Sequence, residues 1–392
     1  MRNISLRFSA QRCILPFAMA VLLSYLATEQ IVAAKKTPMP GSKSSAVYFD
    51  RAHASIEVLN QRWLLHNNST VTWNGINAWQ RFVIADSLTK YVSLTGDRTL
   101  LPLIEQAVAN KEGLDGNDDD LWALIASLNL YELDHDPSLI QYAQSRYLRL
   151  TKEYWDDTCG GGIWWDHERT YKNAITNELL LYAATLLYRT TKDPSYSDWS
   201  VKIWNWFDRS GLINSGALIN DGLTKQCRNN NQNTYTYNQG VLLGGLAGLY
   251  RIDHDQSHIT LATNIARATI SGLSDSNGVL REPVKDLGQD GQIFKGIFVY
   301  HLGRLSPLIK SPADRKVIDS FLQTNADLVW KNRDSIGQID AYWDGERGLP
   351  GAAAQSAGIS LFNATVEAIM QPKSRTDVQD FVPCQRLSFA LS

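Results

Sequence analysis

Three consecutive aspartates, Asp118, Asp119 and Asp120, stand at the start of an apolar segment with the sequence GNDDDLWALIASL. Acidic residues are stabilised by about 0.3–1 kcal/mol each in the first turn of a helix, at the positive end of its dipole, so a purely structural interpretation is open. A catalytic interpretation is open as well. Adjacent carboxylates repel each other, which raises the pKa of one member and lets it act as an acid while its neighbour stays ionised. Glycoside hydrolysis requires that division of roles.

The separation of two such carboxyl groups bears on the mechanism. Retaining glycosidases hold them about 5–5.5 Å apart and inverting enzymes about 6.5–9.5 Å apart. Neighbouring side chains at a helix start can reach the shorter separation. A second acidic pair, Asp156 and Asp157, lies in a segment rich in turn-forming residues, and we interpret it as part of the surface or of a groove rim.

Other kinds of chemistry lack their usual sequence patterns. The 7 histidines are scattered, with no H-E-x-x-H, paired C-x-x-C or calcium-loop spacing, so we predict no metal site. His135 and His254 fall in a repeated turn and are interpreted as structural. No G-x-S-x-G, Walker or dinucleotide-binding motif occurs, and we predict no cofactor. The run Gly160 to Gly162, followed by two tryptophans, indicates a close backbone approach to a flat ligand or a neighbouring loop.

The composition is that of a globular protein. The 392 residues are 44% hydrophobic and 20% charged, and the formal net charge of −2 without a long basic run argues against a nucleic-acid partner. The 12 tryptophans and 16 tyrosines supply flat amphipathic rings beyond the needs of a core, and such rings often stack on sugars.

The N-terminus has the order of a secretory signal. Three arginines within residues 1–12 precede an apolar run at 14–27 and small residues that end at Ala34. We predict a signal peptide at 1–34, a flexible leader at 35–46 and a single catalytic domain at 47–392, with an uncleaved anchor as the alternative. No later segment is apolar over a membrane-spanning length, and the C-terminus lacks the hydrophobic tail of a glycolipid anchor. We therefore expect an exported protein, extracellular or periplasmic, without stable membrane insertion.

Cleavage after Ala34 would leave an odd number of cysteines, Cys159, Cys227 and Cys384. An exported chain favours a disulfide, but its connectivity does not follow from the sequence. We hypothesise a Cys159–Cys227 bond with Cys384 free. Asn67, Asn68 and Asn363 begin N-x-S/T triplets, which would carry glycans only in a eukaryotic secretory route.

A turn recurs along the chain. Apolar segments end in a tyrosine, and five residues later an aspartate opens an amphipathic segment, as at Tyr131 with Asp136, Tyr188 with Asp193 and Tyr250 with Asp255; a looser copy has Tyr91 and Asp97. An aspartate followed by proline is typical of a helix N-cap. The copies are unequally spaced, which favours a closed ring of helical hairpins, with apolar inner and amphipathic outer helices, over a regular solenoid. Residues 328–345 and a helix after Gly351 are expected to close the ring.

Several sequence blocks occur in series with the aspartate cluster: CGGGIWW, YKNAITNELLL, LINDGL, TYNQGVLLGGLAGLY and FKGIFVYHL. In order and spacing, residues 50 to 310 resemble glycoside hydrolase family 76, the endo-α-1,6-mannanases and their fungal cell-wall relatives. The resemblance implies an all-α fold, the (α/α)6 toroid, in a single domain. It also implies a secreted enzyme, monomeric and without cofactor, that acts on α-mannan.

By this resemblance, Asp118 is the nucleophile and Asp119 the general acid/base of a retaining mechanism. Because Asp120 is a third consecutive aspartate, it is ambiguous which two of the three correspond to the family's catalytic pair. Trp122 fills the first of two aromatic positions of the family and Ala123 departs at the second, while Ala126 and Tyr131 match. The residues expected to bind substrate are Trp122, Trp164, Trp165, Asn173, Asn177, Glu178, Tyr237, Asn238, Gln239 and Lys295.

Two other functions remain open at this point. A transglycosidase of the same family would transfer a mannan-containing glycan to a cell-wall polymer instead of to water. A non-catalytic mannan-binding protein would need no juxtaposed acids, so the Asp118–Asp119 pair argues against it. An unrelated helical-toroid enzyme, such as an epimerase or an inverting glycosidase, would not be expected to show this series of blocks.

Overall fold

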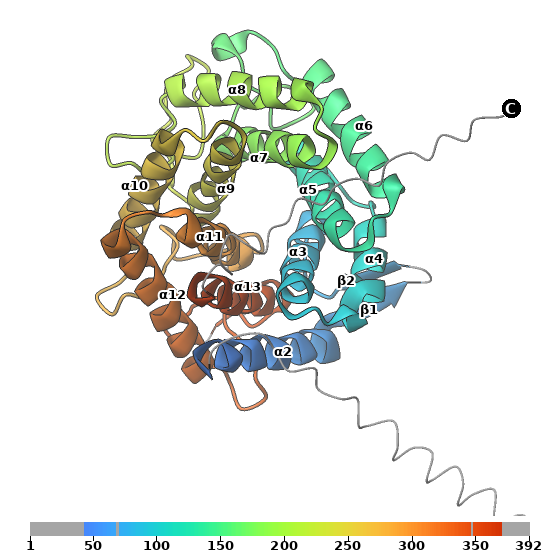
Figure 1. The fold of residues 1–392 in the computed structure, drawn as a ribbon, viewed down its shortest axis with the longest axis vertical. Helices are drawn as coiled ribbons and strands as arrows, with labels where there is room; N and C mark the ends of the chain where they lie inside the picture. The colour runs from blue at the N-terminus through green and yellow to red at the C-terminus, as the bar shows by residue number, and fades with distance from the viewer. Residues whose placement is uncertain (1–42, 68–69, 346–347, 371–392) are drawn as a thin grey trace, which may run out of the picture. The chain divides into compact units, whose positions relative to one another are not determined.

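Two concentric rings of helices make up the part of the chain that the computed structural model describes, residues 43–67, 70–345 and 348–370 (Figure 1). The inner ring contains α3 (Ala78–Thr95), α5 (Asn117–Asp134), α7 (Ala174–Thr191), α9 (Thr236–Asp253), α11 (Gly291–Leu305) and α13 (Ala352–Ile369). The outer ring contains α2 (Lys43–Trp63), α4 (Leu101–Ala109), α6 (Pro137–Glu153), α8 (Pro194–Arg209), α10 (Gln256–Gly272) and α12 (Pro312–Asn332). This arrangement confirms the predicted all-α toroid.

The ring closes through its first and last helices. Each inner helix packs on the next, and α13 packs against α3. Helix α2 also packs against α13, so the first described helix is the outer partner of the last one. Because each outer helix returns antiparallel to the inner helix before it, all inner helices begin at the same end of the ring, which we call the N-terminal end.

The predicted tyrosine-to-aspartate turn has one geometry in its copies. After α5, His135 adopts a left-handed conformation with φ 61°, and its N–H donates to the carbonyl of Tyr131 at 3.0 Å. The Asp136 carboxylate then accepts the N–H of Ser138 at 2.9 Å and caps α6, which begins with Pro137. Lys192 with Asp193 and His254 with Asp255 repeat this turn before α8 and α10. The prediction that these aspartates are N-caps is confirmed.

The fourth, looser copy differs. Asp97 caps a short 3₁₀ turn, Arg98–Leu100, and α4 begins only after it. Two further 3₁₀ turns span Thr158–Gly160 and Ser306–Leu308. The two strands of the described chain, β1 (Leu64–Asn67) and β2 (Thr70–Trp73), form an antiparallel hairpin beside α4.

The two rings differ in burial as predicted. Helix α7 is buried from Ala174 through Leu187, whereas α6 buries only Ala143, Tyr147, Leu150 and Thr151. An outer helix needs one apolar stripe, while an inner helix is covered on both sides. The stacked inner helices therefore form a rigid core that fixes the loops at the N-terminal end.

Several predictions concern the ends of the chain. Helix α2 begins at Lys43, inside the segment predicted as a leader, and α13 is the apolar helix expected after Gly351. The predicted signal peptide, Asn68 and Cys384 lie outside the described residues. Asn363 is buried in α13 and its amide donates to the carbonyl of Ser87 at 2.9 Å, so it is inaccessible to a glycan. In the described ranges, no helix combines the length and apolar character that a membrane crossing needs.

Candidate active site

The aspartate cluster forms the first turn of α5 at the N-terminal end of the ring. Gly116 precedes the helix with φ 130°, and a Cβ at this position would lie 2.9 Å from Oδ1 of Asp118. A residue with a side chain would be strained and would press on the carboxyl group. The Asn117 N–H donates to the carbonyl of Trp165 and its Nδ2 to the carbonyl of Trp164, each at 2.9 Å. The two tryptophans are thereby fixed to the helix start.

The three aspartates divide into a pair and a single structural residue. Asp120 is 5% exposed and forms ion pairs with Arg149 and, at 3.6 Å, with Arg146, both on α6. Successive residues of a helix are rotated by about 100°, so Asp120 faces the outer ring. Asp120 is thus engaged by the outer ring, and Asp118 and Asp119 are the adjacent half-buried residues of the cluster.

Both carboxyl groups of the pair have a raised pKa. Burial, and then the negative charge of Asp119, raise the pKa of Asp118 to about 7, against smaller lowering contributions from the Trp165 side chain and nearby backbone N–H groups. Burial is also the largest cause for Asp119, whose pKa is raised to about 6. The hydrogen bond from the N–H of Asp115 to its Oδ2, at 3.0 Å, lowers that pKa, while the charges of Asp290 and Asp115 raise it. Near neutral pH the pair can therefore hold one proton.

A second polar group lies near Asp118. The hydroxyl of Tyr171 donates to Oδ2 of Asp221 at 2.5 Å. Burial raises the pKa of Tyr237 well above its usual value, and the charges of Asp221 and Asp118 add to the effect. Glu178 is a further neighbour of Tyr237. The structure thus brings the predicted residues Tyr237 and Glu178 together with Asp118.

Glu178 is fully buried, and neither carboxylate oxygen has a hydrogen-bond partner among the described residues. Burial, followed by the charge of Asp221, raises its pKa well above the usual value. A buried carboxyl group without a cationic partner is held neutral. Glu178 therefore adds no further negative charge beneath the pair.

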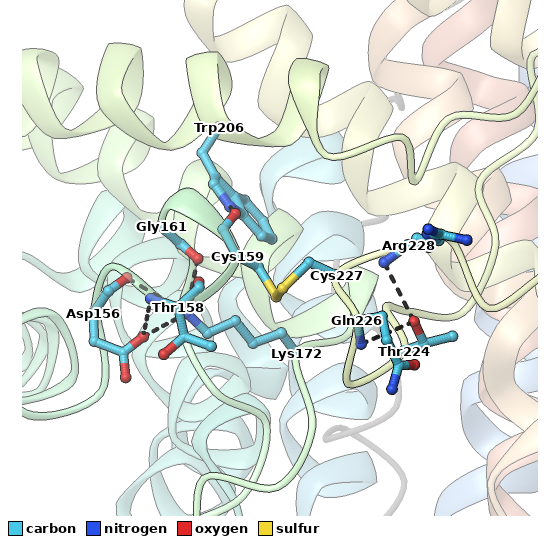
Figure 2. The surroundings of a disulfide bond; sticks show 10 residues. All are labelled: Asp156, Thr158, Cys159, Gly161, Lys172, Trp206, Thr224, Gln226, Cys227 and Arg228. Carbon is cyan, nitrogen blue, oxygen red and sulfur yellow. Dashed lines mark hydrogen bonds and ion pairs between the residues drawn. A yellow bond between two sulfur atoms is a disulfide. The ribbon is translucent and has the colours of Figure 1, made fainter.

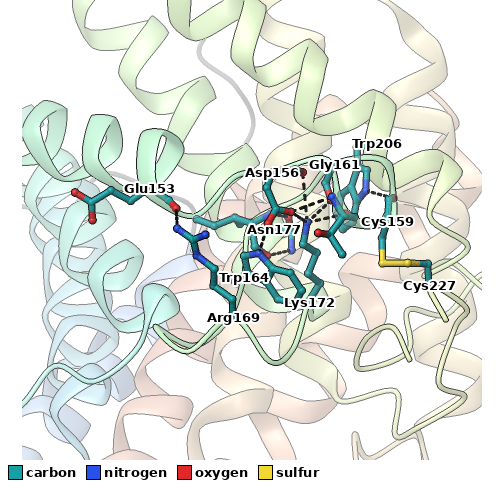
Figure 3. A network of polar contacts seen from close by, with 12 residues as sticks. Glu153, Asp156, Cys159, Gly161, Trp164, Arg169, Lys172, Asn177, Trp206 and Cys227 are labelled. Carbon is teal, nitrogen blue, oxygen red and sulfur yellow. Dashed lines mark hydrogen bonds and ion pairs between the residues drawn. A yellow bond between two sulfur atoms is a disulfide. The ribbon is translucent and has the colours of Figure 1, made fainter. Parts of the chain in front are cut away.

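The Trp164 ring is held by a buried lysine (Figure 3). Its indole N–H donates to Oδ2 of Asp156 at 2.8 Å, and Nζ of Lys172 lies 4.7 Å from the ring centre. The Lys172 ammonium also donates to Oδ1 of Asp156 at 2.7 Å. Although burial opposes it, the hydrogen bonds from Lys172 and Trp164 lower the pKa of Asp156 to about 2. Trp165, in contrast, is 41% exposed.

A disulfide between Cys159 and Cys227 links the loop between α6 and α7, which carries Trp164, to the loop between α8 and α9 (Figure 2). It confirms the hypothesised pairing. The Trp206 indole donates to the carbonyl of Cys159 at 3.0 Å. Gly162 has φ 86°, and a Cβ there would lie 2.5 Å from the Trp206 ring. The expected close approach is therefore to an indole of the neighbouring helix α8.

Two of the predicted substrate-binding residues hold loop backbone, and a third caps a helix. The Asn177 amide accepts from the N–H of Ile163 at 2.8 Å and donates to its carbonyl at 3.1 Å. Gln239 makes the same pair of bonds with Ile219, at 2.8 and 2.9 Å. Asn173 caps α7 by accepting the N–H of Thr176 at 3.2 Å. These contacts position the loops at the N-terminal end.

Two other predicted residues are also buried. Asn238 is fully buried, and its amide has no partner among the described residues. Lys295 is 2% exposed, donates from Nζ to the carbonyl of Ala341 at 2.6 Å and lies 4.7 Å from the Trp343 ring. It lines a cavity of about 550 Å³ between the loops that precede α11 and α13.

Aromatic rings form a row across the N-terminal end. Trp122, 5% exposed, stacks on Trp79 with ring centres 5.6 Å apart, and Trp79 lies 6.3 Å from Phe294. Phe294 in turn stacks on Tyr237 at 4.0 Å. Of these, Trp79 and Phe294 were not predicted, although Phe294 lies in one of the sequence blocks. Asp221 and Tyr171 also lie in such blocks and were likewise missed.

The chain matches the profile of glycosyl hydrolase family 76 over residues 32–376. The chain belongs to glycosyl hydrolase family 76. Among curated members of this family, the mannan endo-1,6-alpha-mannosidase DCW1 of Saccharomyces cerevisiae is 28% identical over 267 residues, which cover 61% of this chain and 59% of that protein. A putative mannan endo-1,6-alpha-mannosidase of Schizosaccharomyces pombe is 28% identical over 281 residues, which cover 64% and 63%. The chain spans about three fifths of the length of these relatives.

Solved structures of the family share the fold. An α-1,6-mannanase of Salegentibacter sp. HEL1_6 is 25% identical with a TM-score of 0.74, covering 82% of this chain and 99% of that one. That structure is an inactive variant with asparagine in place of two consecutive aspartates, in complex with α-1,6-mannotriose. Dfg5 from Chaetomium thermophilum, in complex with glucosamine, is 18% identical with a TM-score of 0.70, covering 84% and 92%. The similarity to Dfg5 concerns the fold alone.

Proposed function

We propose that this protein is an exported endo-acting glycoside hydrolase that cleaves α-1,6-linkages of mannan. The observation that carries the proposal is the Asp118–Asp119 pair, half-buried at the start of α5 with both pKa values raised. Membership of family 76 supports a glycosidase. The inactive mannanase variant supports both the substrate and the pair, since two consecutive aspartates are changed in it and α-1,6-mannotriose is bound.

The reaction is a double displacement that retains the anomeric configuration. In the first step the Asp118 carboxylate attacks the anomeric carbon while Asp119 gives its proton to the leaving glycosidic oxygen, so the glycosidic bond breaks as a glycosyl ester forms. In the second step Asp119, now ionised, takes a proton from water. The water oxygen attacks the anomeric carbon and releases Asp118. The pair ends in its starting protonation state.

The surroundings supply what each role needs. Burial keeps the pKa of Asp119 near 6, high enough for a proton donor at mildly acidic pH. The Trp165 side chain interacts with Asp118 and lowers its pKa, which favours the ionised form. Asp118 has the higher pKa of the two in the free protein, and the family resemblance assigns it the role of nucleophile.

Covalent trapping tests this assignment of roles. An activated 2-deoxy-2-fluoro mannoside slows breakdown of the glycosyl ester, and peptide mass spectrometry then locates the sugar. We expect it on Asp118. A label on Asp119 would reverse the two roles, and its complete absence despite turnover would exclude a retaining mechanism.

The aromatic residues at the N-terminal end are expected to bind the polysaccharide, with Trp165 as the exposed ring among them. Trp165 presents its ring at the rim beside Asp118, and the row from Trp122 to Tyr237 crosses the same end of the ring. Flat rings suit the apolar faces of sugars. Trp164, Asn173, Asn177, Gln239 and Lys295 would then act mainly by shaping this surface, since their polar groups are bonded to backbone or to the acidic rim.

Linear α-1,6-mannan tests the function. The products of the purified protein are followed by NMR, together with Asp118→Asn, Asp119→Asn and a control, Asp157→Asn, at an exposed carboxyl on the rim. We expect short α-configured oligosaccharides from the wild type and the control, and none from the other two variants. Transfer products alone would indicate a transglycosidase. Binding without turnover, unchanged in Asp118→Asn, would indicate a mannan-binding protein.

Export and a monomeric state are part of the proposal. The sequence of the mature N-terminus should begin after Ala34, and light scattering should give the mass of one chain. A mature protein that keeps residues 1–34 would contradict cleavage.

A further inference from the structure

The opposite, C-terminal end of the ring carries a group of cations around a small cavity. This cavity, of about 60 Å³, is lined by Arg189 and Lys192 at the end of α7, Arg251 on α9 and Arg304 on α11. No Asp or Glu of the described residues is among its lining. A water molecule occupies about 30 Å³ in the liquid, so there is room for a compact group larger than one water.

These cations are incompletely bonded within the protein. Nη1 of Arg251 donates to the carbonyl of Ala247 at 3.2 Å, and Nη1 of Arg304 donates to the hydroxyl of Tyr300 at 3.1 Å. Among the described residues, no carboxylate lies within ion-pairing distance of either guanidinium or of Lys192. An arginine has five N–H donors in a fixed fork, so most donors of both arginines remain available.

Two carboxylates nearby are already paired, one of them with Arg189 of the cavity itself. Glu132 pairs with Arg189 at 3.3 Å, and Glu367 pairs with Lys90 at 3.0 Å. Asp86 is buried close by, and desolvation raises its pKa to about 7. Lost hydration, and then the charges of Arg304 and Arg189, lower the pKa of Arg251, which shows that the cations repel one another.

Attraction by the carbonyl groups at the ends of α7, α9 and α11 accounts for part of this cluster. This attraction explains why Arg251 bonds to the carbonyl of Ala247. It does not explain why the cations surround a cavity. Tyr182 adds an independent observation. It is 4% exposed, lines the cavity and has a buried hydroxyl without a partner among the described residues. A buried hydroxyl without a partner is costly unless a ligand or water satisfies it.

A second cavity, of about 150 Å³, shares Arg189 and Arg304 with the first. Its lining is rich in groups that bind hydroxyls: Thr89, Ser93, Asn129 and Glu132. The two cavities therefore offer a cationic compartment next to a polar one, whose lining also includes Lys90.

We propose that this end of the ring binds a phosphorylated sugar, with the phosphate between Arg189, Arg251 and Arg304 and the hydroxylated ring in the adjoining cavity. Arginine forks match the oxygens of phosphate, and each charge-assisted hydrogen bond is stronger than a neutral one. The site lies at the other end of the inner helices from Asp118 and Asp119 and does not depend on the reaction there.

Isothermal titration calorimetry at low salt in a phosphate-free buffer tests the site with mannose 6-phosphate, mannose and inorganic phosphate. We expect mannose 6-phosphate to bind at least about tenfold more tightly than inorganic phosphate, and mannose to show no binding. Equal affinity for the two phosphates would overturn the sugar compartment. No binding of either phosphate would overturn the site.

Variants locate the binding. Arg251→Met removes the guanidinium and keeps the apolar stem, so the protein should fold, and affinity should fall by about tenfold or more. Arg209→Met is the matched control, because Arg209 also donates to a carbonyl four residues earlier, at the end of α8. Unchanged affinity in Arg251→Met, or an equal loss in Arg209→Met, would contradict the placement. Arg304→Lys, which keeps the charge but loses the fork, should also weaken binding.

Discussion

Replacing Asp118 by asparagine should stabilise the protein, and the gain should depend on pH. The folded protein raises the pKa of Asp118 from 3.8 to about 7, mainly by burial. Between these two values the folded state holds a proton that the unfolded state has released, so the free energy of unfolding falls as pH rises. Asparagine mimics the protonated carboxyl group and removes this dependence.

The magnitude follows from the shift. One pKa unit corresponds to about 1.36 kcal/mol, so a rise of about three units costs the wild type about 4 kcal/mol above pH 7. Below pH 4 both states are protonated and the cost vanishes. A domain of this length has an unfolding entropy of about 0.7 kcal/mol/K, so the Tm of Asp118→Asn should exceed that of wild type by about 6 °C at pH 8.

Thermal unfolding from pH 4 to pH 8 measures the difference between the variant and the wild type. Asp119→Asn should also be more stable than the wild type, but its gain in free energy of unfolding should be only about 3 kcal/mol. That gain should stop rising near pH 6, because the pKa of Asp119 is raised to about 6. The exposed-rim variant Asp157→Asn should show no such trend. A Tm difference for Asp118→Asn that is the same at all pH values would refute the reasoning, since burial would then not raise this pKa.

Three further predictions concern the surroundings of the pair. Replacing Cys159 and Cys227 together by serine opens a link across 68 residues and should lower stability by about 4 kcal/mol, measured as a fall in Tm, whereas Cys384→Ser should leave Tm unchanged. Trp165→Ala should raise KM for mannan oligosaccharides in steady-state assays without unfolding the protein, because Trp165 is 41% exposed; an unchanged KM would remove it from the binding surface. Arg149→Met should lower the free energy of unfolding in urea by about 3 kcal/mol and leave kcat unchanged, and a fall in kcat without lost stability would instead place Asp120 in catalysis.

The features predicted correctly from sequence depend on local interactions. The caps at Asp136, Asp193 and Asp255 need only residues within a few positions, and their repetition along the chain predicted the ring of hairpins. The Cys159–Cys227 pairing was hypothesised correctly, but the sequence alone did not determine it. Helix starts were less certain, since α2 begins four residues before the predicted Val47.

The direction of a side chain at the site was harder to predict. Asn177 and Gln239 lie in sequence blocks of the family, and an amide serves equally well to bind a sugar or a loop. Their partners, Ile163 and Ile219, offer only backbone groups and leave no signal in the sequence. Trp79 is distant in sequence from Trp122 and Phe294, and only closure of the ring brings the three together.

The first turn of α5 shows how one helix start serves both stability and chemistry. Asp120 faces α6, where Arg149 and Arg146 neutralise it, so its charge strengthens the contact between the rings. Asp118 and Asp119 receive no arginine or lysine within ion-pairing distance among the described residues, and burial keeps their pKa values high. A cation beside the pair would stabilise the fold but lower both pKa values, and the pair would lose the proton that an acid catalyst must donate. The instability expected at neutral pH and the capacity for acid catalysis therefore have the same physical cause.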